Sequence, residues 1–242
     1  MSSAALSMPD VEIYIDCADI ASIRKAVAAD GRIAGFTTNP ALMRKAGVTD
    51  YREFALAAIA TAGERPISFE VVSDDFDEME REAFVIRSWG GNTFVKIPVT
   101  NSLGVSSAPL IRRLSAAGVP VNVTAILTVE QARDVAEALS PDTPAVVSVF
   151  AGRIADTGVD PIPVMREVVS MTARLPKAKV LWASPRELLN LFHAAEIGCH
   201  IITMTPDLLA KLALIGKDLT EYSRETVLMF LNDATSAGYR LA

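Results

Sequence analysis

The sequence is poor in the residues that most often mark metal and redox chemistry. Its 242 residues include two cysteines, Cys17 and Cys199, and two histidines, His193 and His200. Neither histidine has metal-ligand spacing to another His, Cys or carboxylate, so the sequence predicts no metal and no cofactor. Two isolated thiols are typical of a reducing compartment, so we expect both cysteines to be free and the protein to be cytoplasmic.

Basic charge and long apolar runs are also scarce. Lys and Arg number 23 against 29 Asp and Glu, which gives a net charge of −6. This acidic balance argues against a nucleic-acid partner, which would favour a basic face. No apolar run approaches the ~18 residues of a membrane span, and the first residues lack the basic and apolar stretches of a signal peptide. We therefore expect neither nucleic acid nor a membrane as a partner.

The composition is otherwise that of a globular protein with a sizeable core, because half of the residues are hydrophobic and 21% are charged. Short β-branched runs alternate with helical patterns along the whole chain. The predicted strands are Val11–Asp16, Arg32–Thr37, Pro66–Val71, Thr93–Ile97, Pro120–Ala125, Ala145–Phe150, Lys179–Ala183 and Cys199–Met204. The predicted helices are Ile20–Ala29, Tyr51–Thr61, Asp75–Trp89, Leu103–Ala117, Val129–Leu139, Ile162–Thr172, Pro185–Ala195, Asp207–Leu214 and Thr220–Ala237.

This alternation predicts an α/β fold, and more narrowly a (β/α)8 TIM barrel with an extra C-terminal helix. A doubly wound open sheet is the alternative, but it usually has a Gly-rich phosphate turn after its first strand, and none follows Val11–Asp16. We expect a single barrel domain over residues 1–242, in which residues 218–242 form a C-terminal helical extension.

Lys96 interrupts the apolar run of the fourth predicted strand. A buried lysine is costly unless it is paired, solvated or catalytic. Removal from water also weakens its preference for the charged form, and a neutral amine is a nucleophile. Taken alone, a lysine in such a run is more often a strand-end residue whose ammonium reaches water.

Polar or unusual residues end the other predicted strands in the same way. They are Asp16, Thr38 and Asn39, Glu70, Asn122 and Thr124, Ser148 with Phe150 and Arg153, and Ser184 with Arg186. Singly, each has an ordinary structural explanation, such as a turn former or a surface charge. In a barrel, however, all these strand ends meet at one mouth, where active sites lie. A lysine, two carboxylates and several hydroxyl and amide groups at one mouth predict a functional site.

A lysine amine, two carboxylates and anion-binding arginines without a metal are the groups that Schiff-base carbonyl chemistry requires. The iminium then accepts the electrons, so no Lewis-acid metal is needed. Two alternatives remain at this point. A metal-dependent barrel enzyme lacks ligands in this sequence, and a non-catalytic sugar-phosphate-binding barrel leaves the lysine and its carboxylates without a role.

Several motifs resemble the transaldolase family, and in particular its small single-barrel members, which are related to fructose-6-phosphate aldolase. The motifs follow one another in the family's order over nearly the whole chain. They are Ile15-Asp16-Cys17-Ala18-Asp19, Thr37-Thr38-Asn39-Pro40, Val95-Lys96-Ile97-Pro98-Val99-Thr100, Asn122-Val123-Thr124, Ser148-Val149-Phe150-Ala151-Gly152-Arg153 and Ala183-Ser184-Pro185-Arg186.

The resemblance implies roles for these residues. Lys96 would form the Schiff base, Glu70 would move protons through a water held by Thr124, and Asp16 would take the C4 hydroxyl proton. The remaining residues would bind substrate: Asn39, Asn122 and Ser148 the donor hydroxyls, Arg153, Ser184 and Arg186 the phosphate, with Thr38 and Phe150 in the same site.

Two positions distinguish the two activities of the family. Aldolase members have a glutamine where this chain has Glu70 and a tyrosine where it has Phe150. The resemblance therefore implies a transaldolase, which moves a dihydroxyacetone unit from fructose 6-phosphate or sedoheptulose 7-phosphate to an aldose phosphate. The alternative is an aldolase-like enzyme that releases free dihydroxyacetone. The resemblance leaves two pathways open: the pentose phosphate pathway, or a dedicated pathway that builds a less common sugar phosphate. The resemblance also implies a homo-oligomer, a pentamer or decamer, held partly by the apolar face of the C-terminal helix.

Overall fold

The computed structural model describes residues 7–28 and 31–241. The predicted end of the first helix at Ala29, and the predicted domain ends at residues 1 and 242, lie outside the described residues. The chain divides into two compact units, one formed by residues 9–209 and one formed by residues 210–241 with residues 7 and 8.

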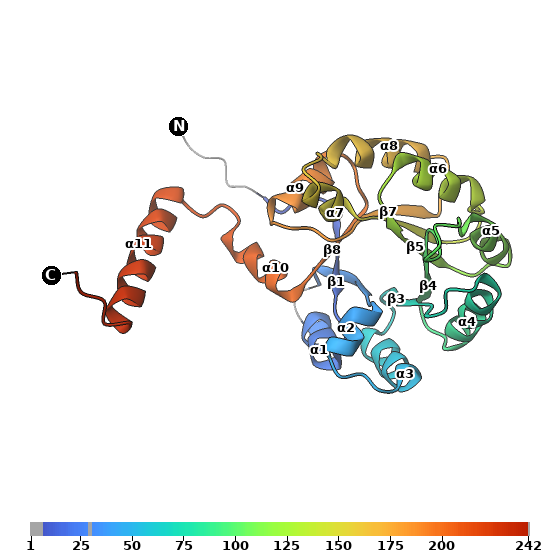
Figure 1. The fold of residues 1–242 in the computed structure, drawn as a ribbon, viewed down its shortest axis with the longest axis horizontal. Helices are drawn as coiled ribbons and strands as arrows, with labels where there is room; N and C mark the ends of the chain where they lie inside the picture. Colours follow the sequence, from blue (N-terminus) through green and yellow to red (C-terminus); the bar gives the residue numbers. More distant parts are fainter. Residues whose placement is uncertain (1–6, 29–30, 242) are drawn as a thin grey trace. The chain divides into compact units, whose positions relative to one another are not determined.

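The first unit is a closed barrel of eight parallel strands, in which each strand pairs with the next in sequence and the last pairs with the first (Figure 1). The strands are β1 (Glu12–Asp16), β2 (Ile33–Thr37), β3 (Ile67–Glu70), β4 (Thr93–Pro98), β5 (Val121–Ile126), β6 (Ala145–Val149), β7 (Ala178–Trp182) and β8 (Ile201–Met204). All eight strands lie where the sequence predicts them, so the (β/α)8 prediction is confirmed.

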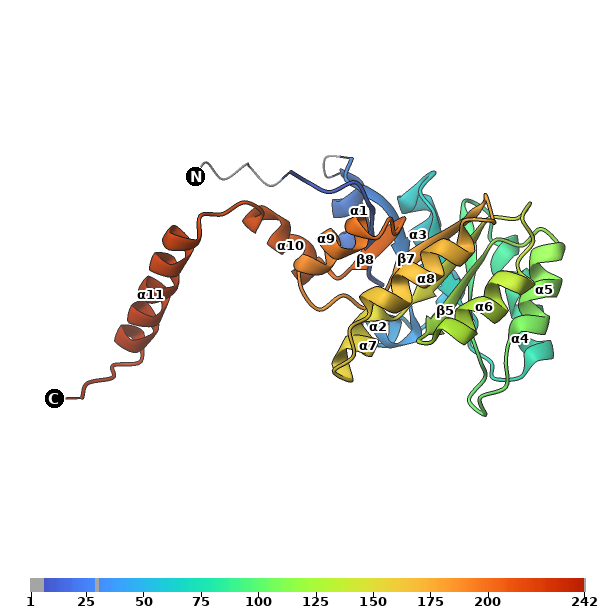
Figure 2. The ribbon, with the colours of Figure 1, turned by 90° about the horizontal axis from the view of Figure 1, so that it is seen from above.

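Helices surround the barrel, and α5, α6 and α8 lie side by side along its outside (Figure 2). The helices of this unit are α1 (Ile20–Ala28), α2 (Pro40–Lys45), α3 (Tyr51–Ala62), α4 (Phe76–Ser88), α5 (Ala108–Ala116), α6 (Val129–Ala138), α7 (Ala151–Asp156), α8 (Ile162–Thr172) and α9 (Leu189–Glu196), while α10 (Pro206–Ala210) has its last residue in the second unit.

The short helices α2 and α7 were not predicted. Asn39 and Pro40 have the composition of a turn, but here Asn39 caps α2 by accepting a hydrogen bond from Leu42 N, and Pro40 occupies the first helical position. Gly152 lowers the helix propensity of the α7 segment. Each helix has six residues, too few to show a periodic pattern.

Two predicted helices begin later than expected. The helix predicted from Leu103 begins at Ala108, because Thr100 and Ser106 form an antiparallel bridge and Asn101 Oδ1 accepts from two loop amides. The helix predicted from Pro185 begins at Leu189. Ser184 precedes it with a left-handed φ of 60°, a conformation that does not lead directly into a helix.

Apolar packing fixes the barrel on both sides of the sheet. Inside, Tyr14, Val146 and Ile201 form a buried layer. Outside, Phe69 contacts Trp89 at 5.7 Å between ring centroids in a T-shaped arrangement. Each such buried side chain contributes roughly 1.5–3 kcal/mol of transfer free energy. This packing holds the strand ends in fixed positions around the mouth.

The second unit contains a 3-10 helix (Lys211–Leu214) and α11 (Leu219–Ser236), which begins with a hydrogen bond from Glu221 N to the side chain of Asp218. No residue of α11 is buried. Val227, Leu228, Phe230 and Leu231 are all exposed apolar residues of this helix. None of the helices in residues 7–28 and 31–241 is long and apolar enough to cross a membrane.

Candidate active site

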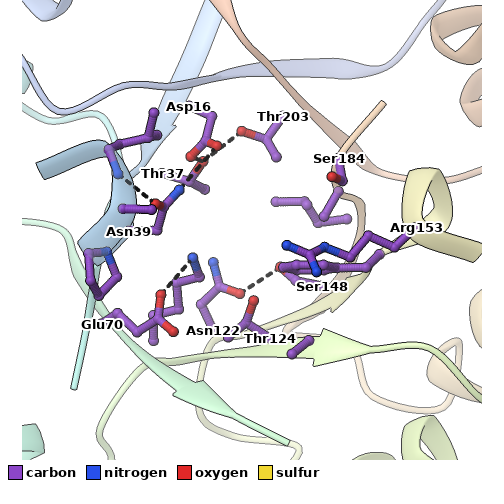
Figure 3. Close-up of a pocket in the computed structure, with 18 of the residues that line it drawn as sticks. Asp16, Thr37, Asn39, Glu70, Asn122, Thr124, Ser148, Arg153, Ser184 and Thr203 are labelled. Atoms are coloured by element: carbon purple, nitrogen blue, oxygen red, sulfur yellow. Dashed lines mark hydrogen bonds and ion pairs between the residues drawn. The ribbon is translucent and has the colours of Figure 1, made fainter. Parts of the chain in front are cut away.

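A cavity of about 1040 Å³ opens at the carboxyl ends of the strands. Its walls come from nearly every strand, and Figure 3 shows Asp16, Glu70 and Arg153 around the same space. Ten of the predicted site residues line it: Asp16, Asn39, Glu70, Lys96, Asn122, Thr124, Ser148, Phe150, Arg153 and Ser184. The barrel therefore brings together residues that lie up to 168 positions apart in the sequence.

Lys96 is held between two oxygens inside this cavity. Its Nζ lies 3.0 Å from Glu70 Oε2 and donates a 3.0 Å hydrogen bond to the carbonyl oxygen of Thr38. Glu70 and Lys96 are direct register partners on β3 and β4, which places the carboxylate beside the amine. Lys96 is 7% exposed, so the predicted explanation in which its ammonium reaches open water does not hold.

Asp16 lies at the end of β1, where it accepts a 2.8 Å hydrogen bond from Thr37 Oγ1 and a longer one, 3.4 Å, from Asn39 Nδ2. Burial raises the pKa of this carboxyl, although the charge of Lys96 and the bond from Thr37 act in the opposite direction. Asp16 is thus a carboxylate with a strengthened affinity for a proton, facing the cavity that also holds Lys96.

Two residues beside Asp16 were missed by the sequence reasoning. Thr37 and Thr203 both line the cavity, and their hydroxyl oxygens lie 2.6 Å apart (Figure 3). Thr203 is a polar residue near the end of an apolar strand, so the signal that identified the other site residues was present in β8 as well. Arg44 and Lys45 at the end of α2 also line the cavity and were missed.

A hydrogen-bonded chain crosses the floor of the site. Asn122 Nδ2 donates to Ser68 Oγ at 2.9 Å, and Ser148 Oγ donates to Asn122 Oδ1 at 2.7 Å. All three residues are buried. The Asn122 amide thus lies between two serine hydroxyls, with its nitrogen toward Ser68 and its oxygen toward Ser148. Ser68 was not predicted.

Thr124 presents a free hydroxyl to the cavity. Its Oγ1 is buried and has no hydrogen-bond partner among the described residues. Such an atom is costly in a folded protein unless a ligand or water completes it. The next residue, Ala125, has a left-handed φ of 62°, and the register between β5 and β6 is irregular here. Local strain of this kind is concentrated at functional sites.

Arg153 and Ser184 form the opposite wall of the site. The Arg153 guanidinium lies over the Phe150 ring, 5.6 Å from its centroid. Gly152 allows the start of α7 to approach Ser184 closely, because a Cβ atom on residue 152 would lie 1.5 Å from the carbonyl oxygen of Ser184. The contact keeps the start of α7 against the end of β7, and so keeps Arg153 near Ser184.

Two predicted residues do not line the main cavity. Thr38 is fully buried, and its hydroxyl donates to the carbonyl oxygen of Ser68. Arg186 forms an ion pair with Asp156 and lines a smaller cavity of about 160 Å³, beside Trp182 and His193. The hydrogen bond from Arg186 lowers the pKa of Asp156. A role of Arg186 in substrate binding stays a prediction.

The described residues contain no group of three or more His, Cys, Asp or Glu placed to hold a metal ion. Both cysteines are free, as predicted. Burial, with a smaller contribution from the nearby carboxylates Asp19 and Asp16, raises the pKa of Cys17 to about 12, so its thiol remains protonated near neutral pH. Cys17 is therefore not an activated nucleophile in this site.

Solved structures with the same fold include a putative lyase/mutase from Burkholderia cenocepacia, with a TM-score of 0.58 at 14% sequence identity over 96% of this chain and 85% of that chain. A putative lactate oxidase from Pediococcus acidilactici aligns with a TM-score of 0.59 at 12% identity, covering 89% of this chain and 71% of its own. At these identities the similarity supports the barrel fold alone.

Sequence comparison is more specific. Residues 13–240 match the family model described as Transaldolase/Fructose-6-phosphate aldolase. A probable transaldolase from Herpetosiphon aurantiacus is 32% identical over 220 residues, covering 90% of this chain and 94% of the relative. Another from Roseiflexus castenholzii is 36% identical over 194 residues, covering 80% and 85%. The predicted resemblance is confirmed, and the chain belongs to the transaldolase/fructose-6-phosphate aldolase family.

Proposed function

We propose that the protein is a metal-independent Schiff-base transaldolase. It moves a dihydroxyacetone unit from a ketose phosphate, such as fructose 6-phosphate or sedoheptulose 7-phosphate, to an aldose phosphate. One observation carries the proposal: the Lys96 amine lies 3.0 Å from Glu70 in a cavity that also contains Asp16. A nucleophile and a base within hydrogen-bond reach are the arrangement that covalent catalysis requires.

The first step joins the substrate to Lys96. Glu70 takes a proton from the ammonium, and the free amine attacks the C2 carbonyl of the ketose to give a carbinolamine. Glu70 returns the proton to the departing hydroxyl, water leaves, and an iminium remains. The unpartnered hydroxyl of Thr124 supplies a place for a water that carries these protons.

The second step breaks the C3–C4 bond. Asp16 removes the proton of the C4 hydroxyl, an aldehyde forms at C4, and the bonding electrons move to C3 and neutralise the iminium as an enamine. The aldose phosphate leaves and an acceptor aldehyde takes its place. The enamine then attacks the acceptor, Asp16 returns its proton, and hydrolysis at Lys96 releases the product.

Two groups of residues in the cavity would bind the two parts of the substrate. Asn39, Asn122 and Ser148 present amide and hydroxyl groups to the hydroxyls of the donor, while Arg153 and Ser184 take the phosphate. Arg186 joins them by exchanging Asp156 for the phosphate, and Thr38 contributes the carbonyl oxygen that holds Lys96.

The chemistry of Phe150 supports transfer over release. Release of free dihydroxyacetone requires a proton at C3 of the enamine, and a phenylalanine in the wall of the cavity cannot supply one. The enamine therefore persists until an acceptor arrives. The second candidate function, an aldolase that releases dihydroxyacetone, requires another proton donor.

The experiment that tests the mechanism is borohydride reduction in the presence of fructose 6-phosphate. A reduced three-carbon adduct is expected on the peptide that contains Lys96, and it should be absent from Lys96→Arg. Lys177→Arg is the matched control, since Lys177 is an exposed lysine that should leave the adduct unchanged. An adduct on another lysine would overturn the assignment.

The same preparation tests transfer. With fructose 6-phosphate alone little free dihydroxyacetone should form, and erythrose 4-phosphate should start turnover, also in the presence of EDTA. Rapid release without an acceptor would make the protein an aldolase, and loss of activity with EDTA would point to a metal.

We also propose that the protein works as a cytoplasmic homo-oligomer, a pentamer or decamer, in the pentose phosphate pathway. The exposed apolar residues of α11 support the assembly, because a second copy would remove them from water.

A further inference from the structure

We infer that Thr203 is a positioning residue for Asp16: its hydroxyl orients the hydroxyl of Thr37 so that Thr37 donates to the carboxylate. The inference deepens the proposed function, because it rests on Asp16 acting as the base of the cleavage step. Nothing in the family resemblance or in the sequence reasoning assigns a role to Thr203.

The proton count of the three groups determines the direction of the chain. Thr37 Oγ1 lies 2.8 Å from Asp16 Oδ1 and 2.6 Å from Thr203 Oγ1. An ionised carboxylate can only accept, so the single hydroxyl proton of Thr37 points to Asp16. The contact between the two threonines must then be made with the proton of Thr203. The resulting order is Thr203 to Thr37 to Asp16.

Burial makes the chain effective. Thr37 is 3% exposed and Thr203 is 6% exposed, so water has little access to either hydroxyl. Hydrogen bonds in such surroundings polarise one another, and a bond to a charged acceptor is stronger than one between neutral groups. The chain therefore stabilises the ionised form of Asp16 more than the protonated form, against the effect of burial.

The strand arrangement explains why Thr203 can act in this way. β1 lies between β2 and β8 in the barrel, so Asp16 is flanked by the strand of Thr37 on one side and by the strand of Thr203 on the other. Thr203 reaches the carboxylate through Thr37, since the structure records no direct bond from Thr203 to Asp16 among the described residues.

The charged and titratable groups that face Asp16 come from other elements. Lys96 on β4 lowers its pKa and Glu70 on β3 raises it. Asn39 at the start of α2 and Thr203 on β8 carry no charge, and the Cys17 thiol that follows Asp16 stays protonated near neutral pH. A change at Thr203 therefore alters the hydrogen bonding of Asp16 without altering the charges around it.

The test compares Thr203→Val with wild type, since valine has nearly the shape of threonine and lacks its hydroxyl. In the pH profile of the C3–C4 cleavage rate, the acidic limb should move to higher pH by about half a unit or more, because Asp16 now needs a higher pH to ionise. Thr203→Ser should restore the limb. The matched control is Thr93→Val, which removes a buried threonine hydroxyl at the start of β4 and should leave the limb in place.

A double-mutant cycle tests the route through Thr37. Thr37→Val should shift the limb further than Thr203→Val, and the double variant should behave like Thr37→Val alone, because the outer hydroxyl then has nothing to orient. Additive shifts would mean that Thr203 acts on Asp16 independently, and an unmoved limb in Thr203→Val would mean that it only fills space. Either result would overturn the inference.

A carbon-13 NMR titration of the Asp16 carboxyl in the resting protein gives a readout that needs no turnover. If borohydride traps no adduct on Lys96, the proposed function fails, but the titration still decides whether Thr203 lowers the pKa of Asp16. If the Thr203→Val variant does not fold, the same titration in Thr203→Ala provides the comparison, and an unchanged pKa there counts against the inference.

Discussion

At the scale of single residues, the ionisation of Asp16 is needed for the proposed chemistry but is opposed by its burial. In the proposed reaction its carboxylate must be ionised to accept the C4 proton, yet burial raises its pKa and so makes ionisation costly in the folded protein. Lys96, Thr37 and Asn39 offset part of that cost. A site of this kind favours chemistry over stability.

The first prediction concerns Asp16→Asn. A carboxyl whose pKa is raised on folding holds its proton longer in the folded than in the unfolded state, so its contribution to stability falls as pH rises above the unfolded value of about 3.9. The variant has no such group. Its free energy of unfolding should therefore gain on wild type as the pH is raised from about 3.9 to neutral, as measured by urea denaturation.

The same variant should still form the Schiff base at Lys96 but lose cleavage, since only the second step uses Asp16, so borohydride should trap the uncleaved six-carbon ketose phosphate. A stability difference that is constant over this pH range would contradict the prediction. Asp160→Asn, a change at an exposed carboxylate, serves as the control.

Individual site residues could be predicted where a polar side chain interrupts an apolar strand near its end, as Lys96, Asn122 and Ser148 do. Ser68 could not be predicted, because a small hydroxyl residue inside a strand is an ordinary structural residue, and the strand already ends in the carboxylate of Glu70. The ion pair of Arg186 with Asp156 was beyond prediction, because the two residues are 30 positions apart and lie in separate loops and helices.

At the scale of elements, the contact between α7 and the end of β7 depends on one missing side chain. A Cβ atom on Gly152 would lie 1.5 Å from the carbonyl oxygen of Ser184, a backbone atom that cannot rotate away. The first turn of α7 and the residues after β7 therefore approach only because residue 152 is glycine.

We predict that Gly152→Ala lowers the free energy of unfolding by roughly 2–4 kcal/mol and raises the KM for phosphorylated substrates. The backbone must separate, and Arg153 and Ser184 separate with it. Gly158→Ala is the control, since a Cβ atom there has no neighbour within 4 Å, and its φ of 82° costs only about 1–2 kcal/mol. Equal effects on KM in the two variants would contradict the prediction.

Elements were predictable where they are long or strongly β-branched. The eight strands follow from alternating apolar runs, and the start of α6 follows from Thr128, whose side chain forms a capping box with Gln131. By contrast, α2 and α7 begin at Pro40 and Ala151, inside segments that look like loops, and each has only six residues.

At the scale of the whole molecule, α11 provides an apolar surface with no buried residue of its own. Apolar area removed from water contributes roughly 25 cal/mol per Å². In the proposed assembly, a second copy of the chain would cover this apolar surface, and symmetry would repeat the same interface at every subunit.

We predict that Phe230→Glu with Leu231→Glu lowers the mass measured by light scattering while the far-UV circular dichroism of the barrel is preserved. Charges at these positions would have to be desolvated in an interface. Asn232→Glu adds a charge at an exposed polar position of the same helix and is the control. A full-length protein that is already monomeric would refute the assembly.

The two tryptophans make the two units distinguishable by spectroscopy. Trp89 follows α4 and Trp182 ends β7, so both belong to the unit of residues 9–209, and residues 210–242 contain no tryptophan. Tryptophan fluorescence, excited selectively so that Tyr222 and Tyr239 do not contribute, therefore reports the melting of the barrel alone. A dye attached to α11 would be needed to follow that helix, and the two signals recorded together would separate dissociation from unfolding.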